Sequence, residues 1–115
     1  MLPLIDTHQH LWDLSRLELP WTGGIPQLNR SFLMSDYLQA LEGQKISKTV
    51  YMEVDAHPDH RQREVEIISE ICSDASNPMQ AAVFCAEPGG VDFEPFLENL
   101  SLIHISEPTR RGLIS

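Results

Sequence analysis

Apolar segments of strand length alternate with amphipathic segments of helix length along this chain, and the alternation constrains its fold most. We expect three strands, one beginning with residues 2–5 and two covering 48–54 and 79–85, and three helices over 35–43, 59–73 and 93–99. Strands that alternate with helices are the repeating unit of a parallel α/β fold. The centre of the third strand is almost wholly apolar, which suits a parallel strand buried on both faces. The sequence therefore predicts an α/β fold.

The first strand carries two histidines, His8 and His10, separated by one residue. Successive side chains of an extended strand point to opposite faces, so both imidazoles are expected on the same face. Two neutral imidazoles on one face can offer lone pairs to one divalent metal such as zinc. The apolar lead-in, Leu2–Ile5, predicts a buried strand with the histidines at its carboxyl end. We therefore expect His8 and His10 to be metal ligands.

A His-x-His pair by itself is common on surfaces and in cores, so its context decides its meaning. Residues 6–12 read Asp-Thr-His-Gln-His-Leu-Trp and follow directly on the apolar lead-in. A strand that ends in this way resembles the amidohydrolase superfamily, and more narrowly its amidohydrolase-2 group of predicted metal-dependent hydrolases, which includes sugar-lactone hydrolases. The resemblance implies a (β/α)₈ barrel with His8 and His10 on its first strand.

Such a barrel needs typically about 250 residues, so the resemblance implies that this chain holds a truncated barrel. Residues 1–99 would supply its first three βα units. In the superfamily the remaining ligands are typically histidines on strands five and six and an aspartate on strand eight that acts on the nucleophilic water. The general base is therefore expected in sequence absent here, and no catalytic residue is assigned. Some members of the narrower group are thought to work without a metal. A dinucleotide-binding sheet is the weaker alternative, because no Gly-x-Gly-x-x-Gly follows the first strand.

Residues 11–34 form a long connection whose Pro and Gly content forbids a continuous helix. Loops of this length in compact domains are usually functional or disordered, and the two tryptophans argue against disorder. In a barrel this segment would be the first βα loop on the active-site face. Trp12 or Trp21 would then wall a substrate pocket, and the alternative is that both rings only pin the loop to the rim.

Glu53 falls near the carboxyl end of the second strand. A carboxylate there would lie at the same mouth as the histidines and bind substrate or support a metal ligand. The alternative is an ordinary charge facing solvent. His57 and His60 follow closely, but Pro58-Asp59 favours a helix start, where histidines are more often solvated than coordinated. We therefore leave both out of the ligand set.

The helix over 59–73 has an apolar stripe at three- and four-residue intervals, formed by Val65, Ile68, Ile71 and Cys72. Its charged residues are expected on the solvated side: Arg61, Arg63, Glu64, Glu66 and Glu70.

The composition excludes several classes of partner. The formal net charge is −9, and no basic cluster stands out, which argues against nucleic acid and anionic membranes. No run of about 18 apolar residues and no signal segment occurs, so we expect a cytoplasmic protein that acts on a small molecule. Cys72 and Cys85 lack metal-site spacing and are expected to be buried thiols.

Residues 100–115 depart from the strand and helix pattern. Eleven consecutive residues, 100–110, resemble the in-frame translation of a transposon-derived adapter used in preparing DNA sequencing libraries. The alternative is a fourth strand over 102–105 with His104 as a third ligand. We reject it, because the preceding helix would be cut to about two turns. The tail is therefore expected to be non-native, and His104 to have no role.

The sequence thus predicts a fragment of a metal-dependent hydrolase, in which an activated water attacks a polarised carbonyl. The resemblance implies a lactone of a sugar acid or of an aromatic breakdown product as substrate. From their places in the chain, Trp12 and Glu53 are expected to bind it. Two alternatives stay open. The chain is either a truncated, non-catalytic fragment with no activity of its own, or a small His-rich metal-binding module.

Overall fold

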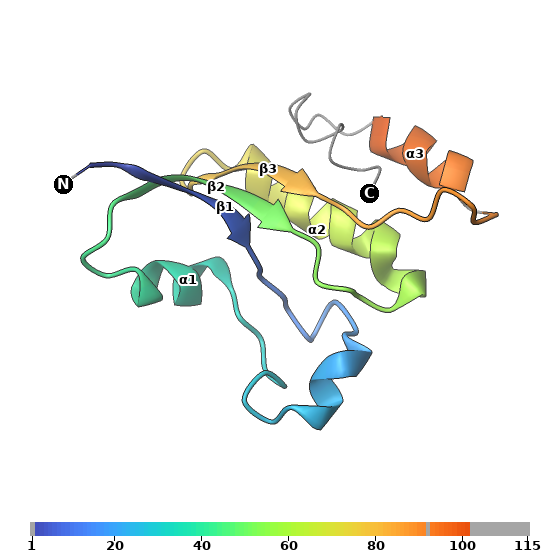
Figure 1. Cartoon of the computed structure of the whole chain (residues 1–115), viewed down its shortest axis with the longest axis horizontal. Coiled ribbons are helices and arrows are strands. Elements are labelled where there is room, and N and C mark those ends of the chain that lie inside the picture. Colours follow the sequence, from blue (N-terminus) through green and yellow to red (C-terminus); the bar gives the residue numbers. More distant parts are fainter. Residues whose placement is uncertain (1, 92, 102–115) are drawn as a thin grey trace.

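The chain folds as a parallel three-stranded sheet with helices between and after the strands. The computed structural model describes residues 2–91 and 93–101. The strands are β1 (Leu4–Gln9), β2 (Ile46–Met52) and β3 (Met79–Val83). The helices are α1 (Met34–Ala40), α2 (Arg61–Ser73) and α3 (Phe93–Ser101), with short 3-10 turns at Pro20–Gly24 and Pro58–His60. The predicted α/β class is confirmed (Figure 1).

The strand order in the sheet is β1-β2-β3, and both pairings are parallel. All three carboxyl ends therefore lie at one edge of the sheet. Asp6 pairs with Thr49 and Gln9 with Tyr51, so β1 has one residue more than β2 across this stretch. Such a bulge re-aims the side chains around it, and here it falls between Asp6 and Gln9, the stretch that contains His8.

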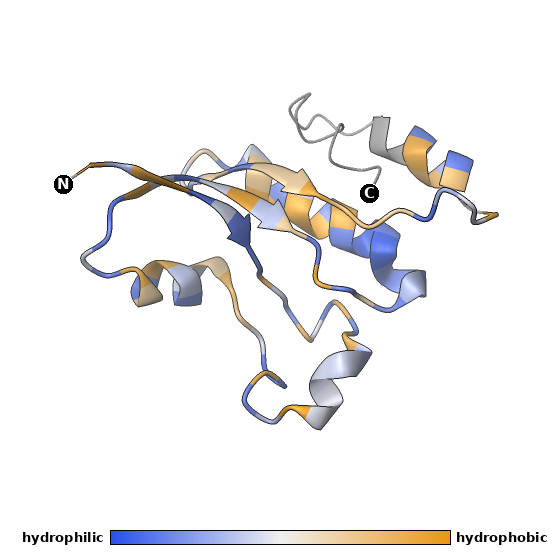
Figure 2. Ribbon diagram, in the orientation of Figure 1, coloured by the Kyte–Doolittle hydropathy of each residue, from blue (hydrophilic) through white to orange (hydrophobic). Residues whose placement is uncertain are grey.

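The core lies between the sheet and α2, which runs along β2 and β3 (Figure 1). Tyr51, Val65, Met79 and Ala82 are completely buried, and Phe84 is 1% exposed. Apolar residues gather on β3 and on α2 where it passes behind the sheet (Figure 2). Burial of one such side chain stabilises a fold by roughly 1.5–3 kcal/mol. This packing fixes β2, whose carboxyl end leads into the candidate site.

The prediction that Leu2–Ile5 is a buried segment is wrong for the described chain. Leu2 is 82%, Leu4 47% and Ile5 60% exposed. β1 is an edge strand with β2 as its one partner in the described sheet, and α2 covers β2 and β3 instead. The segment is apolar, but a strand is buried only where a helix or another strand packs over it.

The prediction that Glu64 is solvated is also wrong, because Glu64 is only 2% exposed. Glu64 is spaced three, four and seven residues from Ile67, Ile68 and Ile71, so it lies on the apolar side of α2. Glu66 and Glu70 are exposed as expected.

α1 begins one residue before the expected start of the helix over 35–43 and ends at Ala40, before the expected end. The Asp36 carboxylate accepts the hydrogen bond from the Leu33 N–H at 2.8 Å. Gly43 has φ +90°, a left-handed conformation that glycine adopts readily and that turns the chain after the helix.

Cys72 and Cys85 are free thiols of intermediate burial, and burial raises the pKa of the Cys72 thiol to about 11. Among the described residues no helix has both the length and the apolar character that crossing a membrane requires. The predictions for residues 102–115, including His104, lie outside the described residues. α3 continues through residue 101, past the boundary expected near Asn99.

Candidate functional site

The two histidines predicted as ligands lie side by side at the end of β1. Their ring centroids are 4.7 Å apart with an interplanar angle of 82°, and both residues are exposed. The two rings therefore contact each other edge to face at the carboxyl edge of the sheet, although the bulge in β1 interrupts strict alternation. Their role as metal ligands stays a prediction.

A backbone contact selects the tautomer of His10. Its Nδ1 lies 3.0 Å from the carbonyl oxygen of Met52, at the end of β2. A carbonyl oxygen can only accept, so the contact requires the proton on Nδ1 and leaves the lone pair on Nε2. Metal-binding histidines commonly donate their other N–H in this way, which fixes the ring and its basicity. The contact also ties the end of β1 to the end of β2.

Asp6 holds the backbone that leads to His8. Its Oδ1 accepts from the His8 N–H at 3.0 Å, and its Oδ2 accepts from the Tyr37 hydroxyl of α1 at 2.6 Å. The Tyr37 hydroxyl, followed by the His8 N–H, lowers the pKa of the Asp6 carboxyl. Burial, with the hydrogen bond to Asp6 second, raises the pKa of the Tyr37 phenol. Asp6 is thus a carboxylate at neutral pH, and it couples β1 to α1.

Two carboxylates, Glu53 and Asp55, follow the end of β2. The Glu53 N–H donates to the Val83 carbonyl of β3 at 3.0 Å, so its backbone still belongs to the sheet edge. Its Oε2 accepts from the Asp55 N–H at 2.6 Å. Asp55 has φ +52°, a conformation that residues other than glycine adopt at a cost, and such positions gather at functional sites. Glu53 is half-buried rather than fully solvated.

The tryptophans fold the long loop back onto these strand ends. Trp12 and Phe32 form an antiparallel bridge, and the Trp12 Nε1–H donates to the Arg30 carbonyl at 2.7 Å. The Trp21 Nε1–H donates to the Val54 carbonyl, also at 2.7 Å. The Trp12 ring packs edge-on against Trp21 and Phe32, with centroids 5.6 and 4.9 Å away. Both rings therefore pin the loop, as one of the two predicted roles requires.

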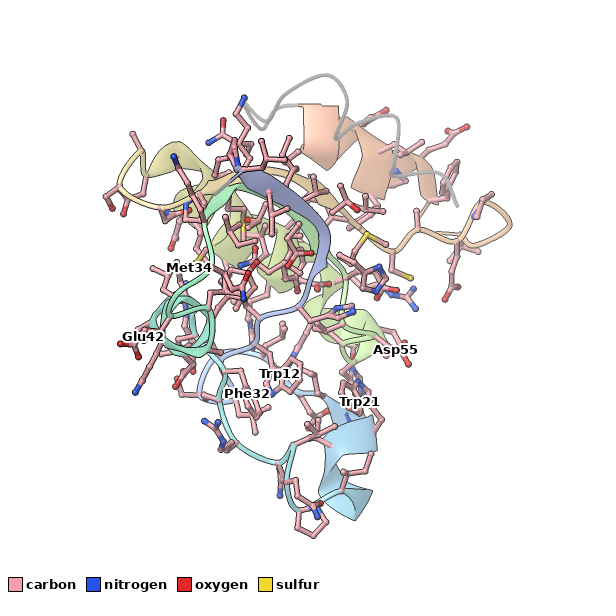
Figure 3. The ribbon with its side chains drawn as sticks, turned by 60° about the vertical axis from the view of Figure 1, so that its left-hand side comes forward. Trp12, Trp21, Phe32, Met34, Glu42 and Asp55 are labelled. Atoms are coloured by element: carbon pink, nitrogen blue, oxygen red, sulfur yellow. The ribbon has the colours of Figure 1, made fainter. Side chains whose placement is uncertain are left out.

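The same rings also wall a hollow of about 450 Å³ at the sheet edge. Figure 3 shows Trp12, Trp21 and Phe32 gathered beneath the sheet, with Asp55 near Trp21. Its lining comes from the end of β1, the long loop and the end of β2: His10, Trp12, Trp21, Leu28, Glu53, Val54 and Asp55. A predicted metal ligand and both predicted substrate-binding residues thus share one hollow. Their roles stay predictions.

A larger hollow, of about 650 Å³, lies beyond the end of β3. Its lining includes Cys85 and Arg61, and Arg61 forms an ion pair with Glu87 at 2.8 Å. Among the residues that the structure describes, no histidine lines it. The smaller hollow is the candidate site, because it is lined by the predicted metal ligand His10 and by the predicted substrate-binding residues Trp12 and Glu53.

His57 and His60, which are not expected to bind a metal, each accept a hydrogen bond from a backbone N–H. His57 Nδ1 accepts from the Asp59 N–H at 3.1 Å, and His60 Nδ1 accepts from the Glu18 N–H at 2.9 Å. These bonds begin the 3-10 turn before α2 and attach the long loop to it. Neither residue lines the hollow beside His10.

Sequence reasoning missed the buried pair of Tyr51 and Glu64. The Tyr51 hydroxyl donates to Glu64 Oε2 at 2.5 Å, and the Val54 N–H donates to the same oxygen at 3.2 Å. Burial raises the pKa of the Glu64 carboxyl against the opposing effect of these bonds. Burial and the neighbouring Glu64 also raise the pKa of Tyr51. The available signal was the spacing of Glu64 with Ile68 and Ile71 on the apolar stripe.

His8 and His10 fit as two members of a metal ligand set. Both are exposed, and His10 has its metal-binding tautomer fixed by Met52. Residues 2–91 and 93–101 contain no group of three or more His, Cys, Asp or Glu arranged to hold a metal. A catalytic zinc usually has three protein ligands and a water. The pair therefore needs a further ligand to complete such a site.

The chain is similar to a solved amidohydrolase 2 from Bifidobacterium longum subsp. infantis, with a TM-score of 0.64 and 29% sequence identity. The likeness covers 76% of this chain and 34% of that one. An uncharacterized protein of Sinorhizobium fredii is 30% identical over 66 residues, which are 50% of this chain and 22% of the relative. No protein-family profile matches. The chain thus spans about a third of the solved neighbour and about a fifth of the relative, and the neighbour supports the amidohydrolase superfamily.

Proposed function

We propose that the whole protein is a hydrolase of the amidohydrolase-2 type that opens a lactone by attack of an activated water on the ring carbonyl. The observation that carries the proposal is the likeness, in sequence as well as fold, to the solved amidohydrolase 2. The pairing of His8 with His10 at the end of the first strand supports it, because this is where the superfamily resemblance places a metal.

His8 and His10 would hold a divalent metal such as zinc, with His10 kept in the required tautomer by Met52. A metal in such a site polarises a carbonyl and lowers the pKa of a bound water. Glu53 would accept a hydrogen bond from a substrate hydroxyl, and Trp12 would wall the ring. The general base is expected in sequence outside this chain.

The charge of the hollow favours an uncharged substrate. Its lining includes the carboxylates Glu53 and Asp55, and no Lys or Arg within residues 2–91 and 93–101 belongs to it. Like charges disfavour a substrate carboxylate there, whereas carboxylates accept hydrogen bonds from hydroxyl groups. A sugar-acid lactone is neutral and carries such hydroxyls, so within the lactones we place it ahead of carboxylated aromatic breakdown products.

The experiment measures hydrolysis of a lactone panel by the whole protein, together with its metal content. We expect His8→Ala and His10→Ala to lose activity and metal together, because each removes one imidazole from the ligand set. His57→Ala is the matched control, since this histidine serves the turn before α2, and it should keep both. Full activity without metal in the two site variants would replace this mechanism with a metal-free lactonase.

We also infer that the 115-residue chain by itself does not hydrolyse lactones, because it spans about a third of the solved neighbour. Activity of this chain on the same panel would overturn the inference. Tight binding of one zinc ion by the chain, abolished by His8→Ala, would favour the small metal-binding module instead.

A further inference from the structure

Glu64 is an exception to the usual distribution of charge in this fold. It lies on α2 with 2% of its surface exposed, next to the fully buried Val65. Carboxylates are almost never fully buried unless they are paired, because removing them from water costs free energy. Among the described residues no Lys, Arg or His forms an ion pair with Glu64. Its position therefore requires another compensation.

That compensation comes from the backbone at the exit of β2. Glu64 Oε2 accepts from the Val54 N–H at 3.2 Å as well as from the Tyr51 hydroxyl at 2.5 Å. The backbone N–H of Glu53, one residue earlier, still donates to the Val83 carbonyl of β3. Val54 is therefore the first residue after β2 whose N–H donates to a side chain of α2 instead of to the sheet. The two bonds meet on one carboxyl oxygen, so they persist whether or not the other oxygen carries a proton.

The other side of the same peptide segment is held by the long loop. The Val54 carbonyl accepts from the Trp21 Nε1–H at 2.7 Å. Val54 thus has its N–H bonded to α2 and its carbonyl bonded to the loop. Its two neighbours, Glu53 and Asp55, are the carboxylate-bearing residues of the hollow, and Asp55 has φ +52°. A backbone in such a conformation persists only where its surroundings fix it.

We propose that Glu64 is a positioning residue, which holds the Val54 backbone from the core side and so sets Trp21 and the Glu53 and Asp55 carboxylates around the hollow next to His10. Glu64 touches neither the hollow nor the histidines, and it acts through Val54. An effect of Glu64 on catalysis rests on the proposed hydrolase function, whereas its effect on the position of the Val54 backbone does not.

The two tryptophans of the chain provide a direct test. Each gives one indole N–H signal in NMR, and only that of Trp21 donates to Val54, whereas that of Trp12 donates to Arg30. In the 115-residue chain, Glu64→Met removes the acceptor of the Val54 N–H and so loosens the Val54 carbonyl that Trp21 donates to. Hydrogen exchange of the Trp21 indole should then speed up by roughly fivefold, the factor that corresponds to about 1 kcal/mol of hydrogen-bond free energy. The Trp12 indole should keep its rate and serves as the internal reference.

Matched variants separate positioning from general stability. Glu64→Gln keeps a carbonyl acceptor of the same length and should restore the Trp21 rate, and Glu66→Gln changes an exposed carboxylate on the same helix and should alter neither indole. Equal acceleration of both indoles in Glu64→Met, or no change at Trp21, would overturn the proposal.

A reciprocal variant keeps the test decisive if Glu64→Met does not fold. Trp21→Phe changes a side chain that is only half-buried, and it should shift the Val54 amide signal more than the amides of Thr49 or Val50 within β2. Trp12→Phe should leave the Val54 amide in place, and a Val54 signal that ignores Trp21→Phe would overturn the proposal.

The activity measurement distinguishes this proposal from the hydrolase function. In the whole protein, Glu64→Met should raise KM for a lactone more than it lowers kcat, and Glu64→Gln should recover KM. A wild-type protein inactive on all lactones would contradict the proposed function and leave the indole result standing. An active enzyme whose KM ignores Glu64→Met would contradict the positioning role.

Discussion

Two tyrosine–carboxylate hydrogen bonds of nearly equal length connect a strand to the helix that follows it, and they lie in opposite environments. At β1 the carboxylate, Asp6, is on the strand and Tyr37 on α1, 2.6 Å apart and partly exposed. At β2 the tyrosine, Tyr51, is on the strand and Glu64 on α2, 2.5 Å apart and buried. The hydrogen bond to Tyr37 lowers the pKa of Asp6, whereas burial raises that of Glu64. The same kind of hydrogen bond therefore accompanies a carboxylate whose charge is stabilised, Asp6, and one whose charge is destabilised by burial, Glu64.

The contrast follows from the position of each strand in the sheet rather than from hydropathy. Central β2 buries the polar Thr49 and Tyr51 completely, whereas edge strand β1 exposes the apolar Leu4 and Ile5. Coverage by α2 and two neighbouring strands outweighs the preference of the individual side chains. The exit of β2 is thus fixed from the core, and the exit of β1, with its histidines, depends on surface contacts.

The largest expected effect comes from breaking the buried bond alone. Tyr51→Phe removes the hydroxyl but keeps the ring, and it leaves Glu64 buried with one donor fewer. We expect the free energy of unfolding to fall by about 1–3 kcal/mol, the cost of an unsatisfied buried polar group, in urea titrations of the 115-residue chain. An unchanged midpoint would mean that the Tyr51–Glu64 bond is not a stabilising contact.

A smaller effect should appear as a pH dependence. Because the pKa of Glu64 is raised above its ordinary value of 4.5, the folded state binds more protons than the unfolded state above that pH. This contribution to stability is complete below pH 4.5 and is lost as pH rises through the raised value. The wild type should therefore lose stability relative to Glu64→Gln as pH rises above 4.5. Glu66→Gln, the exposed control, should follow the wild type, and a constant gap between wild type and Glu64→Gln would refute the assignment.

The partly exposed bond should matter less. Tyr37→Phe removes the hydroxyl that Asp6 accepts from, and solvent can replace it, so we expect a loss of about 0.5–1 kcal/mol. The measurement is the same urea titration. A loss equal to that of Tyr51→Phe would show that the environment of the two bonds does not decide their strength, and the comparison above would fail.

The smallest effect on stability belongs to the exposed apolar residues of β1. Ile5→Lys should change the free energy of unfolding by less than about 0.5 kcal/mol, as is usual for surface positions. It should also reduce self-association at high concentration, because an exposed apolar edge strand is a template for pairing. Light scattering of both proteins checks this. A strongly destabilised Ile5→Lys would mean that β1 is more covered than described.

The sequence predicts those features of the fold and the site that depend on residues close together in the chain. Strand and helix alternation gave the α/β class, the spacing of His8 and His10 gave their contact, and the position of Glu53 after β2 gave its place in the hollow. It failed where a partner distant in sequence decides the outcome. The usual solvation of charged residues predicts an exposed Glu64, whereas its spacing with Ile68 places it on the apolar side of α2.

Coverage is a second property that local patterns do not contain. The apolar residues of Leu2–Ile5 favour burial, but the segment is exposed because no described helix packs over it. The bulge in β1 and the left-handed Asp55 were likewise invisible, since both are set by the register with β2 and by the contacts of neighbouring segments.

The sheet order β1-β2-β3 repeats the order of the strands along the chain. β2 and β3 therefore each pair with the strand synthesised just before them, so each finds its partner already made. Partners are neighbours in strand order, so no third strand lies between them in the sequence, and this limits the entropy of closing each contact. Assembly of this sheet can keep pace with translation, one strand at a time from β1.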